Sequence, residues 1–206
     1  MISVILAIYN GIGLMEKSIE SVIKQDFVDW ELLILDDCSN DNSWGYLQSI
    51  QDTRVKLFKN ENNKGLFYNL NFLINKSKGN IIKLWSQDDI MYPNCLQEVR
   101  DFHLKYPQIT FSYSDRDIID ETGKIIFKYN GWDNTPEIIS VELHSRIFLF
   151  TGSIAGNIAN VAINKWALDK YGLFRDDMKY AADLDMWERL TVDYEIGRIN
   201  IPLIQL

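Results

Sequence analysis

Cysteine is scarce in this chain, where Cys38 and Cys95 are the only two among 206 residues. Two thiols make no disulfide framework, and their spacing matches no metal-binding pattern. We therefore expect both to stay reduced, as in a cytosolic protein. Long apolar runs are also missing, since no uninterrupted stretch could span a bilayer. Met1 leads directly into strand-like residues, so we expect no secretory signal peptide.

Clustered positive charge is a second absence. The chain has 21 Lys and Arg residues against 29 Asp and Glu residues, which gives a formal net charge of −8. No basic block occurs, and this argues against a nucleic-acid groove and against a polybasic membrane surface. Repeats, low-complexity tracts and linkers are lacking too. Apolar residues make up 47% of the chain, enough for a sizeable core in one compact unit.

The most informative stretch joins an expected strand to a pair of acidic residues. Residues 81–85 form a short, mostly apolar run that is typical of an interior strand of a parallel sheet. Asp88 and Asp89 follow at its carboxyl end, where ligands bind in open α/β sheets. Adjacent carboxylates repel each other and favour a cation between them, and Mg²⁺ or Mn²⁺ suits such oxygen ligands. A solvated Asp-Asp turn before Pro93 is the alternative interpretation.

Strands and helices alternate through the first half of the chain. We expect strands at residues 3–9, 31–35, 55–59 and 81–85, with helices at about 14–23, 43–50, 66–75 and 93–105. This alternation predicts a parallel, right-handed α/β sheet. The rhythm changes after Pro107. There we expect strands at 109–113, 161–164 and 195–201, a hairpin within 118–126, and helices at 141–150, 165–170 and 183–191.

Polar residues follow three of the expected parallel strands, and such strand ends meet at one edge of a sheet. Tyr9 ends the first strand, Asp36 and Asp37 end the second, and Asp88 and Asp89 follow the strand at 81–85. A nucleoside needs an aromatic face for its base, a carboxylate for its base or ribose, and a metal for its phosphates. Tyr9, Asp37 and the Asp88-Asp89 pair supply these groups in turn.

Several longer segments carry a recognisable pattern in a fixed order. They include Tyr9-Asn10, Asp36-Asp37-Cys38-Ser39-Asn40-Asp41 and Ser86-Gln87-Asp88-Asp89. The full set is residues 3–11, 31–41, 62–66, 86–89, 156–158, 171–174 and 181–187. Together they resemble family 2 glycosyltransferases of the GT-A fold, over nearly the whole chain.

The resemblance implies a fold and a division of the chain. The fold is an α/β GT-A (Rossmann-like) architecture, with a mostly parallel central sheet flanked by helices and a smaller acceptor-side mixed lobe. Residues 1–206 would form a single domain. Residues 1–106 would be its nucleotide-sugar-binding half and residues 107–206 its acceptor-binding half.

The implied activity is an inverting transfer of a sugar from a nucleoside diphosphate sugar to an acceptor hydroxyl, with Mg²⁺ or Mn²⁺ as cofactor. A base removes the acceptor proton while the metal stabilises the leaving diphosphate. Uridine is the favoured base, and the acceptor would be a carbohydrate or lipid-linked saccharide in cell-surface polysaccharide or glycolipid synthesis. We expect a cytoplasmic location, compatible with the inner face of the membrane and with a homodimer.

The resemblance also assigns roles to individual residues. Asp183 stands at the position of the catalytic base, and Asp89 at that of the direct metal ligand. The nucleotide-binding residues would be Ala7, Tyr9, Asp37, Lys83 and Asp88, and the acceptor-side residues Gly156, Asn157, Asp185 and Trp187. Trp85, Trp132, Trp166 and Trp187 are candidates for stacking on sugars, but burial in the core is the commoner role of such rings.

The chain departs from the family pattern at several positions. Ala182 stands where Glu is usual, Gln87 replaces a frequent Ala or Ser, and Leu70 occupies the place of a common diphosphate-binding Arg. Lys83 is a candidate to compensate for that missing Arg. The chain ends at Leu206, whereas relatives often continue over the site.

Three other functions compete with the transferase. A catalytically inert nucleotide-sugar-binding subunit of the same fold would explain Ala182. A phospho-acceptor receiver domain would explain Asp36-Asp37, but not the long second half that contains Asp183. A nucleotidyltransferase would need a basic residue in the Gly-containing loop after the first strand, and residues 10–13 contain none.

Overall fold

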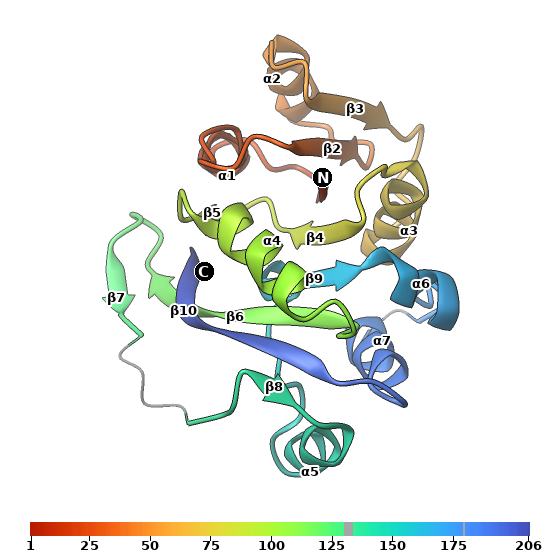
Figure 1. Ribbon diagram of the computed structural model, residues 1–206. Coiled ribbons are helices and arrows are strands. Elements are labelled where there is room, and N and C mark those ends of the chain that lie inside the picture. Colours follow the sequence, from red (N-terminus) through yellow and green to blue (C-terminus); the bar gives the residue numbers. More distant parts are fainter. Residues whose placement is uncertain (130–133, 179) are drawn as a thin grey trace.

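The computed structural model describes residues 1–129, 134–178 and 180–206, so Trp132 lies outside the described residues. The first half alternates strands and helices, as the sequence predicts (Figure 1). It consists of β1 (Ile2–Ile8), α1 (Met15–Ile23), β2 (Trp30–Asp36), α2 (Ser43–Ser49), β3 (Val55–Lys59), α3 (Leu66–Lys76), β4 (Ile81–Trp85), β5 (Ile90–Met91) and α4 (Cys95–Lys105).

The second half is more irregular. It consists of β6 (Phe111–Ile119), β7 (Ile125–Phe127), β8 (Ile138–Ile139), α5 (Val141–Thr151), the short 3₁₀ helix η1 (Ile158–Asn160), β9 (Val161–Asn164), α6 (Lys165–Tyr171), α7 (Ala182–Leu190) and β10 (Ile196–Gln205). Among the described residues, no helix has both the length and the apolar character that crossing a membrane would require.

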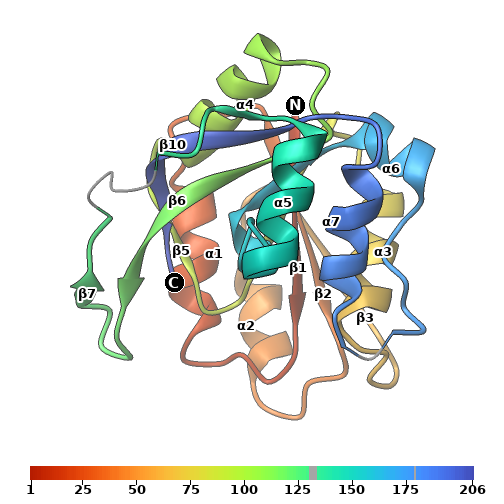
Figure 2. The same ribbon diagram turned by 90° about the horizontal axis from the view of Figure 1, so that it is seen from below.

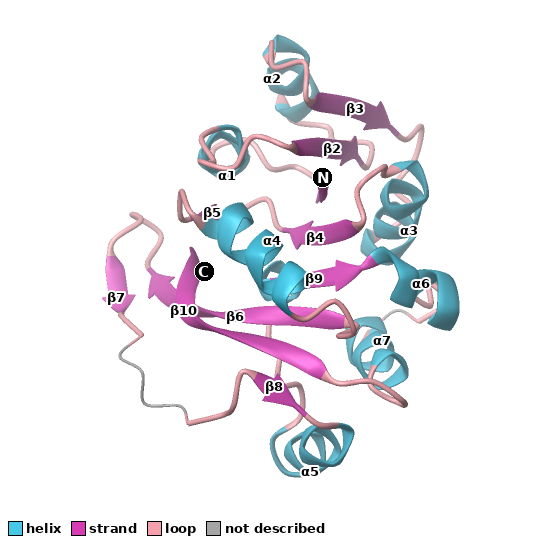
Figure 3. Ribbon diagram, viewed as in Figure 1, coloured by secondary structure: helices cyan, strands magenta, loops and turns pink. Residues whose placement is uncertain are grey.

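Strands from both halves join one mixed sheet in the order β3-β2-β1-β4-β9-β6-β10-β5 (Figure 3). The first four of these are parallel, and Ile5 of β1 lies opposite Leu33 of β2 and Leu84 of β4. β9 runs antiparallel between β4 and β6, and β10 is parallel to β6. The expected α/β fold with a largely parallel sheet is therefore confirmed.

The sheet separates two hydrophobic cores, because alternate residues of a strand point to opposite faces. On β1, Val4 and Leu6 join the core beneath α1, α2 and α4, whereas Ile5 joins the core beneath α3, α6 and α7. Figure 2 shows α3 and α7 together on one side of the strands. Burial of apolar surface at roughly 25 cal/mol per Å² holds these layers together. The carboxyl ends of the parallel strands stay open between the helices.

Two strands extend further than the sequence predicts. β6 continues to Ile119 instead of ending near residue 113, and β10 continues to Gln205 instead of residue 201. The extra residues pair with each other, with register shifts near Pro202. The β6 extension contains the polar residues Ser114 and Asp115, so no apolar pattern in the sequence predicts it. Pairing with β10 fixes its extended conformation, because strand formation depends strongly on tertiary context.

Candidate functional site

A pocket of about 320 Å³ opens at the carboxyl ends of β1, β2 and β4. Those strands are parallel neighbours, so the residues that follow them meet at one sheet edge. Four predicted nucleotide-binding residues, Ala7, Tyr9, Asp37 and Asp88, line this pocket together. The structure thus brings together residues that are far apart in the sequence.

Asp37 holds the turn that forms one wall of the pocket. Its Oδ1 accepts hydrogen bonds from Asn60 Nδ2 at 2.7 Å and from the backbone N–H of Lys64 at 2.8 Å. Its Oδ2 accepts one from the backbone N–H of Gly65 at 2.9 Å. Gly65 has a φ of +86° and begins α3, and this left-handed conformation favours glycine. Asn63 and Gly65 then line the pocket.

Asn69 is a pocket residue that our sequence analysis missed. It is only 1% exposed, lies on α3, and its Oδ1 accepts a hydrogen bond from Asn60 Nδ2 at 2.8 Å. The available signal was a polar residue beside Leu70 and Leu73, which face the core. A buried amide must be hydrogen-bonded, so Asn69 fixes the position of the turn against the helix.

Gln87 bridges the ends of β1 and β4. Its Oε1 accepts a hydrogen bond from the backbone N–H of Tyr9 at 3.1 Å. The adjacent loop is tied to the segment after β2, because the backbone N–H of Asn10 donates to Ser39 Oγ and that of Gly11 to Ser43 Oγ. The replacement of the usual Ala or Ser by Gln87 therefore supplies a contact that positions Tyr9 at the mouth of the pocket.

The two acidic residues after β4 lie in different environments. Asp88 is exposed and lines both the main pocket and a neighbouring pocket of about 260 Å³, whereas Asp89 is 4% exposed and lines only the neighbouring one. Burial raises the pKa of Asp89 to about 7, and the charge of Asp88 acts in the same direction. The Ser86 hydroxyl and the Lys83 ammonium group oppose that rise.

These carboxylates fit a divalent cation that shares its ligands with a diphosphate. Among the residues that the structure describes, the buried Asp89 Oδ2 has no hydrogen-bond partner, and a metal ion would satisfy it. Hard cations such as Mg²⁺ take oxygen ligands and often bind through one or two carboxylates plus substrate phosphates. Over residues 1–129, 134–178 and 180–206, no group of three or more His, Cys, Asp or Glu side chains is arranged to hold a metal. The remaining ligands would have to come from the substrate or water.

The burial of Lys83 contradicts the prediction that its side chain contacts the nucleotide. Its side chain is fully buried and its Nζ donates a hydrogen bond to the backbone carbonyl of Ala159. Residue 83 lies in the middle of β4, so its side chain enters the protein interior instead of reaching the strand end. Burial lowers the pKa of Lys83 to about 8. Lys83 therefore cannot replace the missing diphosphate-binding Arg in this structure.

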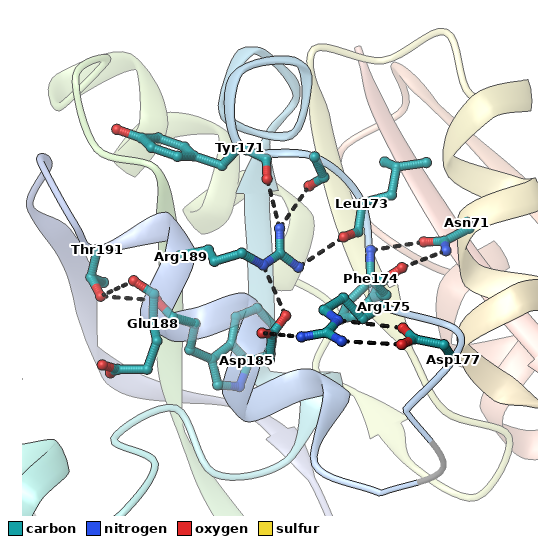
Figure 4. Close-up of polar contacts among 12 residues, drawn as sticks. Asn71, Tyr171, Leu173, Phe174, Arg175, Asp177, Asp185, Glu188, Arg189 and Thr191 are labelled. Atoms are coloured by element: carbon teal, nitrogen blue, oxygen red, sulfur yellow. Dashed lines mark hydrogen bonds and ion pairs between the residues drawn. The ribbon is translucent and has the colours of Figure 1, made fainter.

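Asp183 and Asp185 lie in the first turn of α7 and differ in their contacts. Figure 4 shows Asp185 beside the guanidinium of Arg189. Asp185 Oδ2 accepts a hydrogen bond from Arg189 Nε at 2.8 Å. The same guanidinium donates to the backbone carbonyls of Tyr171 and Leu173. Asp183 is partly exposed and has no hydrogen bond or ion pair with any residue that the structure describes. Asp185 therefore anchors the loop before α7, while Asp183 keeps its carboxylate available.

Trp187, predicted on the acceptor side, is 1% exposed and so has the buried role that is commoner for tryptophans; its ring cannot stack on an acceptor sugar. Its ring contacts Phe111, with the centroids 5.2 Å apart, and Phe174, with the centroids 6.2 Å apart. Asp185, also predicted on the acceptor side, is occupied by Arg189 as described above. The two residues belong to the packing of α7, since residues at these positions face the core or the preceding loop.

Gly156 and Asn157 lie in the segment between α5 and η1. Gly156 has a φ of +66°, and Asn157 caps η1 by accepting a hydrogen bond from the backbone N–H of Ala159 at 2.9 Å. Ile158, the next residue, lines the main pocket. Residues 156–158, from the second half of the chain, thus border the main pocket.

Comparison with known proteins agrees with this geometry. The sequence model of glycosyl transferase family 2 matches residues 3–159, which include every strand that borders the main pocket. The chain belongs to glycosyl transferase family 2. It is therefore a domain of a glycosyltransferase enzyme family.

Two relatives of this family 2 domain are bacterial proteins. One is "UDP-Glc:alpha-D-GlcNAc-diphosphoundecaprenol beta-1,3-glucosyltransferase WfgD" of Escherichia coli, which is 35% identical over 123 residues, or 60% of this chain and 48% of WfgD. The other is an uncharacterized glycosyltransferase of Haemophilus influenzae, 28% identical over 198 residues, or 93% of this chain and 60% of the relative. The chain thus spans about half to three fifths of these relatives.

Solved structures share the fold of this family 2 domain. S. aureus TarS 1-349 in complex with UDP superimposes with a TM-score of 0.82 at 20% identity, over 100% of this chain and 60% of TarS. The mannosyltransferase PcManGT from Pyrobaculum calidifontis, in complex with GDP-Man and Mn2+, gives a TM-score of 0.73 at 15% identity, over 100% of this chain and 56% of that protein. These likenesses establish the fold.

Proposed function

We propose that this family 2 domain transfers a sugar from a UDP-linked donor to an acceptor hydroxyl, with inversion at the transferred carbon. The observation that carries the proposal is the pocket in which Tyr9, Asp37 and Asp88 converge at the carboxyl ends of three parallel strands. An aromatic ring, a carboxylate and an acidic pair are the groups that a base, a ribose and a metal-bound diphosphate require. Residues 1–106 would then bind the donor and residues 107–206 the acceptor.

The donor nucleotide would enter with its base beside Tyr9 and the turn that Asp37 holds. Tyr9 is 46% exposed, so its ring is free to stack on a uracil base. The turn is already fixed by three hydrogen bonds to Asp37, two from the backbone N–H groups of Lys64 and Gly65 and one from the Asn60 side chain. A pre-formed wall of this kind lowers the entropic penalty of ordering the site when the nucleotide binds. UDP is the choice because WfgD is named as a UDP-Glc enzyme and TarS binds UDP.

Asp88 and Asp89 would hold a Mg²⁺ or Mn²⁺ ion, with Asp89 Oδ2 as the direct ligand. When bound, such an ion stabilises negative charge on the leaving diphosphate. The complex of PcManGT with GDP-Man and Mn2+ supports a metal in this fold. Asp88 would lie between the ion and the donor, because it lines both pockets. Without a cation, the adjacent carboxylates would repel the diphosphate.

Asp183 would act as the general base that removes the acceptor proton. Its carboxylate is partly exposed, has no partner among the described residues and sits in the first turn of α7. An inverting displacement needs one such base on the acceptor side, and Asp185 is committed to Arg189. Asp183 is therefore the available candidate on α7.

A catalytically inert nucleotide-sugar-binding subunit is the second candidate. Ala182, where the family usually has Glu, is fully buried, so position 182 supplies no supporting carboxylate next to Asp183. Incubation with UDP-glucose or UDP-N-acetylglucosamine and Mn²⁺ separates the two functions. We expect slow release of UDP into solution, which Asp183→Asn should reduce if Asp183 also activates water. UDP binding without release from any UDP-sugar would support the inert subunit.

A further inference from the structure

A third pocket, of about 290 Å³, lies in the second half of the chain, between β6, β7 and the segment that follows α5. Its lining combines polar and apolar side chains. The apolar ones are Ile118, Phe127 and Ile154, and the polar ones are Tyr113, Ser114, Asp115, Arg116 and Tyr129. Asp115 and Tyr129 are both hydrogen-bonded to the buried Arg198 guanidinium. The proposed donor chemistry does not use this pocket.

Arg116 differs from every other arginine of the chain in having no counterion among the residues that the structure describes. Each of the others forms an ion pair with an Asp or Glu, as Arg198 does with Asp115 at 3.0 Å. Arg116 makes no ion pair or hydrogen bond with any residue in the described part of the chain. It is also only partly exposed, so water cannot solvate it fully. A half-buried guanidinium of this kind favours an anion from outside the chain.

Gly156 makes room for the Arg116 guanidinium. A Cβ atom at position 156 would lie 2.9 Å from Arg116 Nη1, and the φ of +66° also disfavours any residue with a side chain. The guanidinium is therefore packed on the backbone of the segment between α5 and η1. Two residues further on, Ile158 lines the nucleotide pocket. The Arg116 pocket and the nucleotide pocket thus share one short segment of chain.

The pocket offers a second unsatisfied group and an apolar rim. Ser114 Oγ is buried without a hydrogen-bond partner among the described residues. Beside the pocket, Ile126 and Phe127 of β7 are 64% and 47% exposed, and Figures 1 and 2 show β7 projecting from the body of the sheet. A planar guanidinium matches phosphate oxygens in a bidentate geometry, and exposed apolar residues match hydrocarbon. A neutral sugar would need neither a cation nor this rim.

We propose that Arg116 and Ser114 bind a phosphoryl group of the acceptor, and that the rim formed by Ile118, Phe127 and Ile154 contacts an apolar chain attached to that phosphate. The acceptor would then be a lipid-linked phosphate ester whose sugar hydroxyl reaches the donor. This inference rests on the proposed function only in taking the ligand to be the acceptor. Arg116 would be a specificity-determining residue, with no part in binding the donor.

Binding of geranyl phosphate tests the proposal, because this soluble probe joins a phosphate monoester to a short apolar chain. We expect it to bind the wild-type protein in calorimetry or protein-observed NMR, with inorganic phosphate and geraniol each binding more weakly. Arg116→Gln should weaken geranyl phosphate binding by about tenfold or more, the usual loss when a charge-assisted hydrogen bond is removed. Arg116→Lys should retain part of the affinity.

Arg146→Gln is the matched control, because Arg146 is an exposed arginine on α5 paired with Glu142. It should leave geranyl phosphate binding unchanged. Equal geranyl phosphate affinity in wild type and Arg116→Gln would overturn the phosphate site. Equal affinity for inorganic phosphate and geranyl phosphate would overturn the apolar chain. UDP titrated with Mn²⁺ should bind wild type and Arg116→Gln alike; if UDP binds neither while geranyl phosphate still binds, the proposed function fails and the phosphate site stands.

Discussion

The carboxylate of Asp37 accepts a hydrogen bond from the backbone N–H of Gly65 at 2.9 Å, and this contact joins the end of β2 to the start of α3. The other carboxylate oxygen binds the neighbouring N–H of Lys64. One side chain therefore sets the shape of the pocket wall before any ligand arrives. Without the Asp37 carboxylate, the backbone N–H groups of Lys64 and Gly65 would lose their hydrogen-bond acceptors.

We expect Asp37→Asn to weaken UDP binding about tenfold to a hundredfold, because an amide cannot accept at both of its polar atoms. One N–H of the turn would then face an NH₂ group, and the turn would shift. Calorimetric titration with UDP measures the change. The control is Asp26→Asn, an exposed carboxylate outside the pocket. Unchanged UDP affinity in Asp37→Asn would remove Asp37 from the binding site.

Asp183→Asn should lower sugar transfer by about 10² to 10⁴-fold and leave UDP affinity nearly unchanged, because a general base acts on the acceptor proton only in the transition state. Asp185→Asn should lower stability by roughly 1 kcal/mol through the contact with Arg189, with a smaller effect on turnover. Turnover kinetics and thermal unfolding of both variants separate these roles. Transfer that survives Asp183→Asn but not Asp185→Asn would move the base to Asp185.

The buried pair of Asp115 and Arg198 should stabilise the second half of the chain. Arg198 is 0% exposed, and its Nη2 donates to Asp115 Oδ2 at 3.0 Å and to the Tyr129 hydroxyl. Asp115→Leu should destabilise the protein by about 3–5 kcal/mol, because it removes the carboxylate that pairs with a buried guanidinium. The double variant Asp115→Leu with Arg198→Met should recover much of that loss. Chemical denaturation measures both, and equal instability of the two variants would show that the loss of this ion pair is not the cause.

His103 should make the protein less stable as the pH falls. Burial lowers the pKa of His103 to about 4 from an ordinary 6.5, and its Nε2 lies 2.9 Å from Ser112 Oγ. Below pH 6.5, His103 therefore binds a proton in the unfolded chain but stays neutral in the folded protein. The free energy of unfolding then decreases as the pH falls from 6.5 to about 4. The loss is on the order of 3 kcal/mol. In His103→Gln, the denaturation midpoint should fall less steeply with pH between pH 6.5 and 5 than it does in wild type. An equal pH dependence in the two proteins would exclude His103 as the cause. Burial also lowers the pKa of His144, so His144 too makes the folded state less stable as the pH falls. This loss is the same in wild type and in His103→Gln.

The sequence predicts most of the first half of the fold, and the reason is physical. Apolar runs such as Ile81–Trp85 are buried on both faces, so burial alone determines that they are strands. The short strands β5 and β8 are not predicted, because each has two residues and depends on pairing with β10. The β6 extension through Asp115 also depends on that partner. These features arise from contacts between distant segments, which local patterns do not report.

The site is partly predictable for a related reason. Residues at strand ends, such as Tyr9 and Asp88, converge once the strands are known to be parallel. Lys83 and Trp187 are misplaced, because a motif position does not show which way a side chain points, and both point into the core. Arg116 has no sequence signal, since only the folded arrangement shows that it has no counterion within residues 1–129, 134–178 and 180–206.

Metal-dependent binding of UDP tests the central claim most directly. Calorimetry should be run with wild type, Asp89→Asn and the matched control Asp26→Asn, an exposed carboxylate outside both pockets, each with Mn²⁺ and with EDTA. We expect Mn²⁺ to strengthen UDP binding by about tenfold or more in wild type and in Asp26→Asn, a usual size for coupling between two ligands. Asp89→Asn should lose most of that gain. Equal UDP affinity in Mn²⁺ and EDTA, or no UDP binding in either, would contradict a metal-dependent nucleotide-sugar transferase.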